Sequence, residues 1–243
     1  MMTFSLSLNK RNNVIGPKTT KPSILYNPAT PARTPAAINP DSSLGWEEAA
    51  KLLRGSQKQS PELEAAQFRF ESPLVATGKN MQEYALKSFP PKTPLLKGAI
   101  DLMSRIFHEF EYDKQASTVD TTVEQLFSNK RGVCQDFAHF AISCLRSIGL
   151  TARYVSGYLE TSPPPGKPKL IGTDASHAWF DIYVPDIGWV GLDPTNNQQP
   201  NESYITVAWG RDYGDVAPVK GVVMGGGQHQ LTVSVDVASL PEK

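Results

Sequence analysis

Apolar residues recur at steps of three and four along two central stretches of the chain, which is the spacing of a helix with one buried face. The first stretch spans residues 96–110, and Thr93, followed by Pro94, is its expected N-cap. The second stretch spans residues 134–148 and is stopped by Gly149. The pattern therefore predicts two main helices in the middle of the chain.

After the second helix the apolar period falls to two residues, which is typical of β-strands. Strands are expected at residues 153–159, 177–184, 189–192, 204–209 and 231–237. Shorter helices are expected at residues 46–54, ended by Gly55, and at residues 121–129, where Thr121-Thr122-Val123-Glu124 resembles a capping box. Helices first and strands afterwards predict an α+β fold with an antiparallel sheet.

The first 40 residues differ in composition from the rest of the chain. They contain six prolines, no Asp or Glu, and no hydrophobic period. A segment of this kind does not bury enough apolar surface to fold, so we expect a disordered or divergent N-terminal arm over residues 1–44. An organelle transit peptide is the alternative, and the lack of an amphipathic helical pattern argues against it.

The charge balance argues against nucleic acids and anionic membranes as partners. Lys and Arg number 24, Asp and Glu number 24, and the formal net charge is zero. No apolar stretch is long enough to span a bilayer, and no apolar signal segment follows Met1. The two cysteines, Cys134 and Cys144, would lie roughly 15 Å apart on one helix, too far for a disulfide. Two free thiols fit a reducing compartment, so we expect a cytoplasmic protein.

Cys134 has the position of a catalytic thiol. The first turn of a helix has N–H groups without helical partners and carries the positive end of the helix dipole, and both favour a thiolate. Arg131 adds positive charge, and Gly132 allows close backbone approach. The same N–H groups, that of Cys134 first among them, are candidate donors to the oxyanion of a tetrahedral intermediate.

His177 and Asp193 are the candidate base and the candidate residue that orients it. His177 opens one predicted strand, and Asp193 closes the next. If these strands are antiparallel neighbours, the start of one lies beside the end of the other, and the two side chains meet at one edge of the sheet. The helix of Cys134, packed against that edge, would complete a Cys–His–Asp triad. Asp174 is the alternative orienting residue.

Four short segments surround these candidate residues. They are Gly132-Val133-Cys134-Gln135-Asp136-Phe137-Ala138, the stretch 145–158, Ser176-His177-Ala178-Trp179, and the stretch from Gly188-Trp189 to Asp193-Pro194-Thr195. Together they resemble the transglutaminase-like superfamily, and especially its bacterial branch of candidate cysteine proteases. The resemblance is densest over residues 107–197. It implies a papain-like core, one catalytic domain over residues 45–243, and a catalytic triad of Cys134, His177 and Asp193.

The resemblance implies a cysteine-dependent amide-bond hydrolase, a protease or amidase, that acts on a peptide or protein through a thioester acyl-enzyme. A protein-glutamine transglutaminase with the same triad, and a non-catalytic binding module on the same fold, are the alternatives. No cofactor or metal is expected, because no acidic or Cys/His cluster supplies the ligands. Gln135 is a candidate for the oxyanion hole, and Trp179 for the core or for a wall of the substrate cleft. Cys144 is expected to be a buried core residue without a catalytic role, and His139 a surface or core residue.

Overall fold

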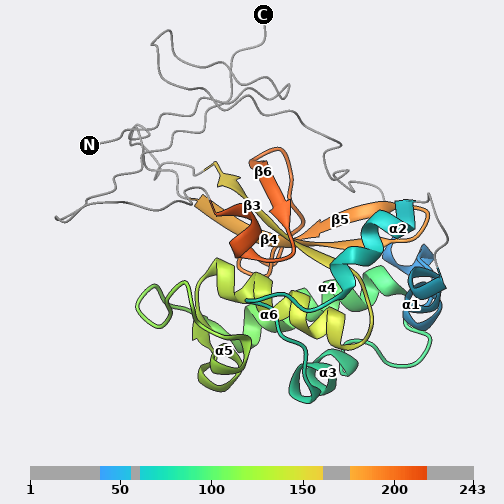
Figure 1. Ribbon diagram of the computed structural model, residues 1–243, viewed down its shortest axis with the longest axis horizontal. Coiled ribbons are helices and arrows are strands. Elements are labelled where there is room, and N and C mark those ends of the chain that lie inside the picture. Colours follow the sequence, from blue (N-terminus) through green and yellow to red (C-terminus); the bar gives the residue numbers. More distant parts are fainter. Residues whose placement is uncertain (1–38, 56–60, 161–175, 218–243) are drawn as a thin grey trace, which may run out of the picture.

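The computed structural model describes residues 39–55, 61–160 and 176–217, which form a layer of helices packed against one antiparallel sheet (Figure 1). The expected α+β architecture is therefore confirmed. The strand expected at 231–237 lies outside the described residues.

The sheet has four strands in the order β5-β4-β3-β6, and each neighbouring pair is antiparallel. A separate parallel pair of two-residue strands, β1 and β2, leads directly into the central helix α6. The strands of the main sheet begin and end within one residue of the predicted positions. Their bounds are β3 Ala152–Leu159, β4 Ser176–Val184, β5 Gly188–Leu192 and β6 Tyr204–Gly210, with β1 Glu111–Tyr112 and β2 Arg131–Gly132 before them.

The helical layer is built around α6 (Cys134–Ser147), which begins at the predicted residue. It contacts β3 and β4 of the sheet as well as α3, α4 and α5. The other helices are α1 Trp46–Gly55, α2 Pro61–Ala66, α3 Lys79–Leu86, α4 Leu95–Glu109, α5 Val123–Asn129 and α7 Tyr213–Val216, with short 3-10 turns at Pro40–Ser42 and Gln67–Arg69.

The central helix is enclosed on all sides, whereas its apolar period predicted a single buried face. Each residue from Asp136 to Arg146 is buried. The polar side chains on the second face are accommodated because distant backbone groups pair with them. Ser143 donates to the Ala76 carbonyl, for example. Such partners come from far along the chain, so the local period does not reveal them.

Arg146 ties the C-terminal end of α6 to three other segments. Its guanidinium donates to the carbonyl oxygens of Phe68 at 2.9 Å, Ala152 at 3.0 Å and Arg211 at 2.8 Å. The side chain is buried, and burial lowers its pKa to about 10, which leaves it charged at neutral pH. One cation thus links the end of α6 to the turn at Phe68, to the start of β3 and to the segment after β6.

Two helix N-caps lie one residue later than predicted. The N-cap of α4 is Pro94, because the carbonyl of Thr93 is taken by the backbone N–H of Trp46 at 3.0 Å. The capping box of α5 is made by Thr122 and Gln125, each of which accepts the backbone N–H of the other.

Residues 39–44, which the sequence assigned to the N-terminal arm, pack against α4. The carbonyl of Leu44 accepts the N–H of Leu95 at 2.8 Å, and the hydroxyl of Ser43 accepts the N–H of Leu96 at 3.0 Å. These contacts satisfy N–H groups that the first turn of the helix leaves without partners. The folded part of the described chain therefore includes residues ahead of the expected boundary.

Candidate active site

Cys134, the first residue of α6, is held by a tight approach of β2 to the helix. A Cβ atom at Gly132 would lie 2.7 Å from Leu126 Cδ1 and 2.8 Å from Asp136 Oδ2, so the site has no room for a side chain. The Asp136 carboxylate also accepts the backbone N–H of Val133 at 2.8 Å. These contacts fix the turn that starts the helix, and with it the partly buried, free thiol of Cys134.

His177 and Asp193 meet at one end of the sheet, as expected for two antiparallel neighbouring strands. The pairing of β4 with β5 ends at Phe180 and Leu192, so Asp193 follows the last paired residue of β5 and lies beside the first residues of β4, which pair with β3 but not with β5. His177 Nε2 lies 2.7 Å from Asp193 Oδ2. The carboxylate is fully buried and the imidazole is only 10% exposed, so water screens this contact little.

The thiol of Cys134 is the other neighbour of the imidazole, and its proximity acts to raise the pKa of His177. Because Nε2 faces Asp193, the ring nitrogen left for the thiol is Nδ1. Burial acts to lower the pKa of His177, but its hydrogen bonds and the charges of its two partners outweigh burial and raise the pKa to about 9. Burial acts to raise the pKa of Asp193, and the bonded His177 holds that pKa below its ordinary value. The imidazole thus lies between thiol and carboxylate.

Three further side chains, which the sequence analysis missed, surround Asp193. The hydroxyl of Tyr204 lies 2.6 Å from Asp193 Oδ2, and Asn196 Nδ2 lies 2.7 Å from the same oxygen. Gln198 Nε2 donates to the Tyr204 hydroxyl at 2.6 Å. The other carboxylate oxygen accepts the backbone N–H of Thr195 at 2.8 Å. No local pattern marks these residues, because their common feature is a meeting point in space.

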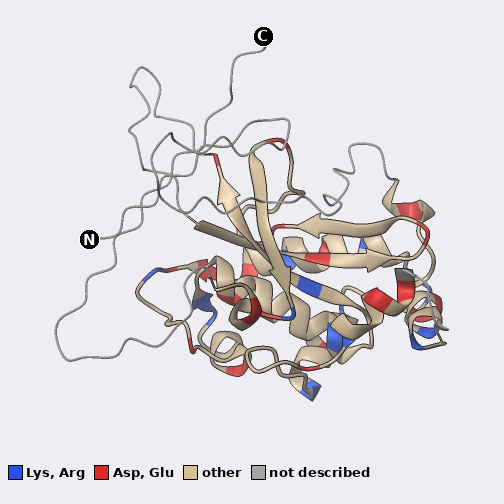
Figure 2. Cartoon of the chain, turned by 45° about the horizontal axis from the view of Figure 1, so that its top comes forward, with Lys and Arg blue, Asp and Glu red and all other residues tan. Residues whose placement is uncertain are grey.

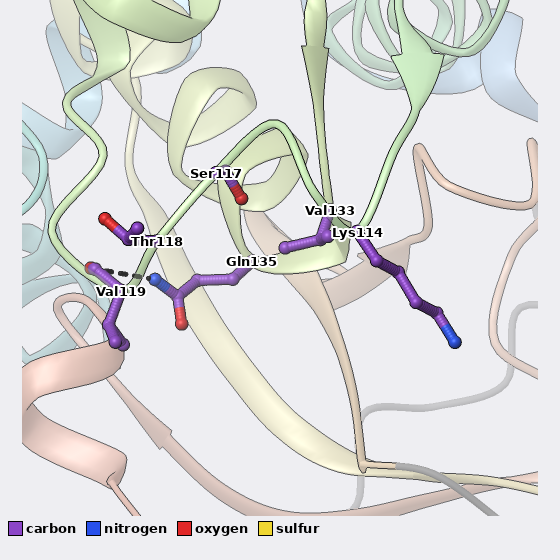
Figure 3. Close-up of a pocket in the computed structure, with 6 residues that line it drawn as sticks. All are labelled: Lys114, Ser117, Thr118, Val119, Val133 and Gln135. Atoms are coloured by element: carbon purple, nitrogen blue, oxygen red, sulfur yellow. Dashed lines mark hydrogen bonds between the residues drawn. The ribbon is translucent and has the colours of Figure 1, made fainter.

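Gln135, the candidate oxyanion donor, turns its side-chain amide toward a neighbouring loop. Its Nε2 donates to the carbonyl oxygen of Val119 at 3.2 Å, beside a pocket of about 170 Å³ (Figure 3). The pocket is lined by Lys114, Ser117, Thr118, Val119, Val133 and Gln135. In this arrangement the amide anchors the loop. The backbone N–H groups of the first turn of α6 remain the donors without helical acceptors.

Trp179 packs behind the imidazole. It is 1% exposed, and its ring centroid lies 6.0 Å from that of His177 and 5.3 Å from that of Tyr204. A Cβ atom at Gly157 would lie 2.6 Å from Trp179 Cη2, so the indole fills the space that the glycine leaves. Of the two roles expected for Trp179, the structure shows the one in the core.

Cys144 lies in the core, as expected, and His139 takes the core position of the two expected for it. Cys144 is fully buried, and burial raises the pKa of its thiol. His139 Nε2 accepts the backbone N–H of Tyr213 at 3.1 Å, and burial lowers the pKa of His139 to about 4. The neutral ring therefore serves as a packed acceptor. Asp174 lies outside the described residues.

The described elements carry no face of a single charge sign in the view of Figure 2. Within residues 39–55, 61–160 and 176–217, no three His, Cys, Asp or Glu side chains are grouped to hold a metal ion. In the same ranges, no helix has the length and apolar character needed to cross a membrane.

Two known proteins are similar to this chain in sequence. An uncharacterized protein of Mycobacterium tuberculosis is 48% identical over 162 residues, which are 65% of this chain and 52% of that protein. This chain therefore spans about half the length of that relative. The protein-glutamine gamma-glutamyltransferase of Pseudomonas aeruginosa is 33% identical over 103 residues, which are 41% of this chain and 15% of that protein.

A structural comparison agrees with them. A crystal structure from Cytophaga hutchinsonii, described as that of a candidate cysteine protease, matches with a TM-score of 0.54 and 25% identity, over 68% of this chain and 54% of that one. The family model of the transglutaminase-like superfamily matches residues 83–194, a segment that contains Cys134, His177 and Asp193. Over residues 83–194, this chain is thus similar to the transglutaminase-like superfamily.

Proposed function

We propose that this protein is a cysteine-dependent amide-bond hydrolase, a protease or amidase. Cys134 is its nucleophile, His177 its acid–base group, and Asp193 the residue that orients the imidazole. The observation that carries the proposal is the line of contacts from the thiol at the start of α6, through the imidazole, to the buried carboxylate. A binding module would need no such alignment of these three groups.

In the proposed reaction the Cys134 thiolate attacks an amide carbonyl carbon, and the backbone N–H groups of the first turn of α6 stabilise the oxyanion. The protonated His177 gives its proton to the leaving amine, and a thioester acyl-enzyme forms. Water then attacks the thioester while His177 takes a proton from it, and the carboxylic acid and thiolate separate. The pKa of His177, about 9, keeps the ring protonated at neutral pH, which is the form that the first step uses.

Transamidation is the second candidate function, and one finding favours it. The Pseudomonas aeruginosa relative is a protein-glutamine gamma-glutamyltransferase. If a primary amine replaces water as acyl acceptor, the same thioester gives a new amide bond. The nucleophile, the base and the oxyanion donors are then unchanged, and only access to the acyl-enzyme differs.

We propose a peptide or protein as the substrate. We also propose the cytoplasm as the compartment, because the nucleophile acts only as a reduced thiol. The balanced charge gives no reason to propose a nucleic acid or a membrane as partner.

The first test is alkylation of Cys134 by iodoacetamide, followed by mass spectrometry over a range of pH, with wild type compared to His177→Ala. At mildly acidic pH we expect His177→Ala to react at least about tenfold more slowly, because the imidazolium no longer stabilises the thiolate. Cys144→Ala is the matched control and is expected to behave as wild type, since that thiol is buried. Equal Cys134 rates in wild type and His177→Ala would refute the proposal and favour the binding module.

The second test separates the two acyl acceptors. Casein is incubated with wild type and with Cys134→Ala, with and without a fluorescent primary amine. Cys134-dependent peptide release indicates hydrolysis, and Cys134-dependent labelling of casein indicates transamidation. Peptide libraries extend the hydrolysis test to smaller amides.

A further inference from the structure

Asp193 Oδ2 is shared by three donors from three parts of the chain. His177 Nε2 from β4 lies at 2.7 Å, Asn196 Nδ2 at 2.7 Å, and the Tyr204 hydroxyl from β6 at 2.6 Å. A carboxylate oxygen offers two in-plane lone pairs, so three close donors compete for the same electron density. The bond to the imidazole therefore depends on the other two.

The hydrogen-bond pattern fixes the direction in which the Tyr204 hydroxyl donates. An ionised carboxylate only accepts, so the hydroxyl proton points at Asp193. Gln198 Nε2, at 2.6 Å, occupies the acceptor side of the same hydroxyl. Donation from Gln198 polarises the O–H bond and strengthens its donation to the carboxylate.

Burial strengthens these hydrogen bonds, because little water competes for the carboxylate of Asp193. Asp193 is fully buried, and the Tyr204 ring packs 5.9 Å from the imidazole centroid and edge-on against Trp179. The titratable groups that face the pair from the described elements are Cys134 of α6 and Tyr204 of β6. Among the described residues, Tyr204 is thus the one neutral donor to the carboxylate that comes from a strand of the sheet.

We infer that Tyr204 is a positioning residue that weakens the hold of His177 on its proton by sharing Asp193 Oδ2, an inference that rests on the proposed function of the triad. The hydroxyl stabilises the carboxylate most when the imidazole is neutral, because the carboxylate then lacks a compensating cation. Loss of the hydroxyl favours the imidazolium, and the proton stays on His177 to higher pH. Tyr204 and Gln198 thereby set the upper pH limit of the acid form that protonates the leaving amine.

The test is an NMR titration of the histidine rings in Cys134→Ala protein, with and without Tyr204→Phe, with the His177 signal assigned by its loss in His177→Gln. We expect Tyr204→Phe to raise the His177 midpoint by about half a pH unit to one pH unit. Gln198→Leu is expected to give a smaller shift in the same direction. Tyr183→Phe removes a hydroxyl that lies 3.4 Å from Glu62, away from the site, and is expected to give no shift.

An unchanged or lowered midpoint in Tyr204→Phe overturns the inference, since a purely structural role would change the melting temperature alone. If Tyr204→Phe does not fold, Gln198→Leu decides, and an unchanged midpoint there overturns the inference. In protein that keeps Cys134, the alkaline limb of the kcat/KM profile is expected to move by the same amount. A shifted NMR midpoint in a protein without activity would count against the proposed function and leave the positioning role standing.

Discussion

Replacement of Gly157 by alanine tests whether the sheet around His177 is as closely built as the structure shows. Gly157 pairs with His177 across β3 and β4, and it lies at the register shift between β3 and β6. A Cβ atom there would lie 2.0 Å from the carbonyl oxygen of Ile205 and 2.6 Å from Trp179 Cη2. The first contact is with backbone, so no side-chain rotation relieves it.

The magnitude follows from the movement that the new atom requires. Ordinary contacts begin at 3.4 Å, so β6 must retreat from Gly157 by more than an ångström, which breaks nearby inter-strand hydrogen bonds. Overpacking costs about 1–3 kcal/mol, and each lost hydrogen bond adds about 1 kcal/mol. We therefore expect Gly157→Ala to lower the free energy of unfolding by about 3 kcal/mol or more.

The assay is urea unfolding followed by circular dichroism, with Gly55→Ala as the control. A Cβ atom at Gly55, the last residue of α1, has no neighbouring atom within 4 Å, so its substitution is expected to change stability by less than about 1 kcal/mol. A loss below about 1 kcal/mol in Gly157→Ala would show that β6 can move away from Gly157 at little cost, and it would refute the claim that the sheet is closely packed there.

Three other predictions concern buried charge and thiols. Arg146→Met removes a cation from three carbonyl oxygens and is expected to lower the free energy of unfolding in urea by about 3 kcal/mol or more. A loss below about 1 kcal/mol would contradict the stabilising role of these three contacts. His177 has a folded pKa raised from 6.5 to about 9, so its stabilisation relative to His177→Gln is complete below pH 6.5 and disappears as pH rises through 9. That stabilisation is at most about 3 kcal/mol, and a stability difference that stays constant with pH would contradict it. Finally, a thiol reagent is expected to modify Cys134 but not the buried Cys144 in native protein, and both in urea; native reaction of both would contradict the packing.

Much of the fold was predictable because its signals are local. The alternation of apolar residues predicted the four strands of the main sheet to within one residue, and the stripe from Cys134 predicted the start of α6. The approach of His177 to Asp193 was also predictable, because a short connection between two strands makes them antiparallel neighbours. That each residue takes its catalytic part stays a prediction.

The contacts that complete the site were not predictable from local pattern. Asp193 follows β5 and Tyr204 opens β6, yet these strands lie at opposite edges of the sheet. The two residues are joined by the connection between β5 and β6, which pairs Asp193 with Gln198 and brings Tyr204 to the carboxylate. The enclosure of α6 has a similar origin, since the partner of Ser143 lies 67 residues away along the chain.

The order of the four groups along the chain has a consequence for biosynthesis. Cys134 leaves the ribosome well before His177, Asp193 and Tyr204, and it belongs to the helical layer while they belong to the sheet. A nascent or truncated chain that ends before β6 therefore carries the thiol without a fully supported base. Under the proposed mechanism the triad is complete only once β4 and the residue after β5 have joined the helical layer, so a chain that ends before Asp193 lacks the group that orients its base.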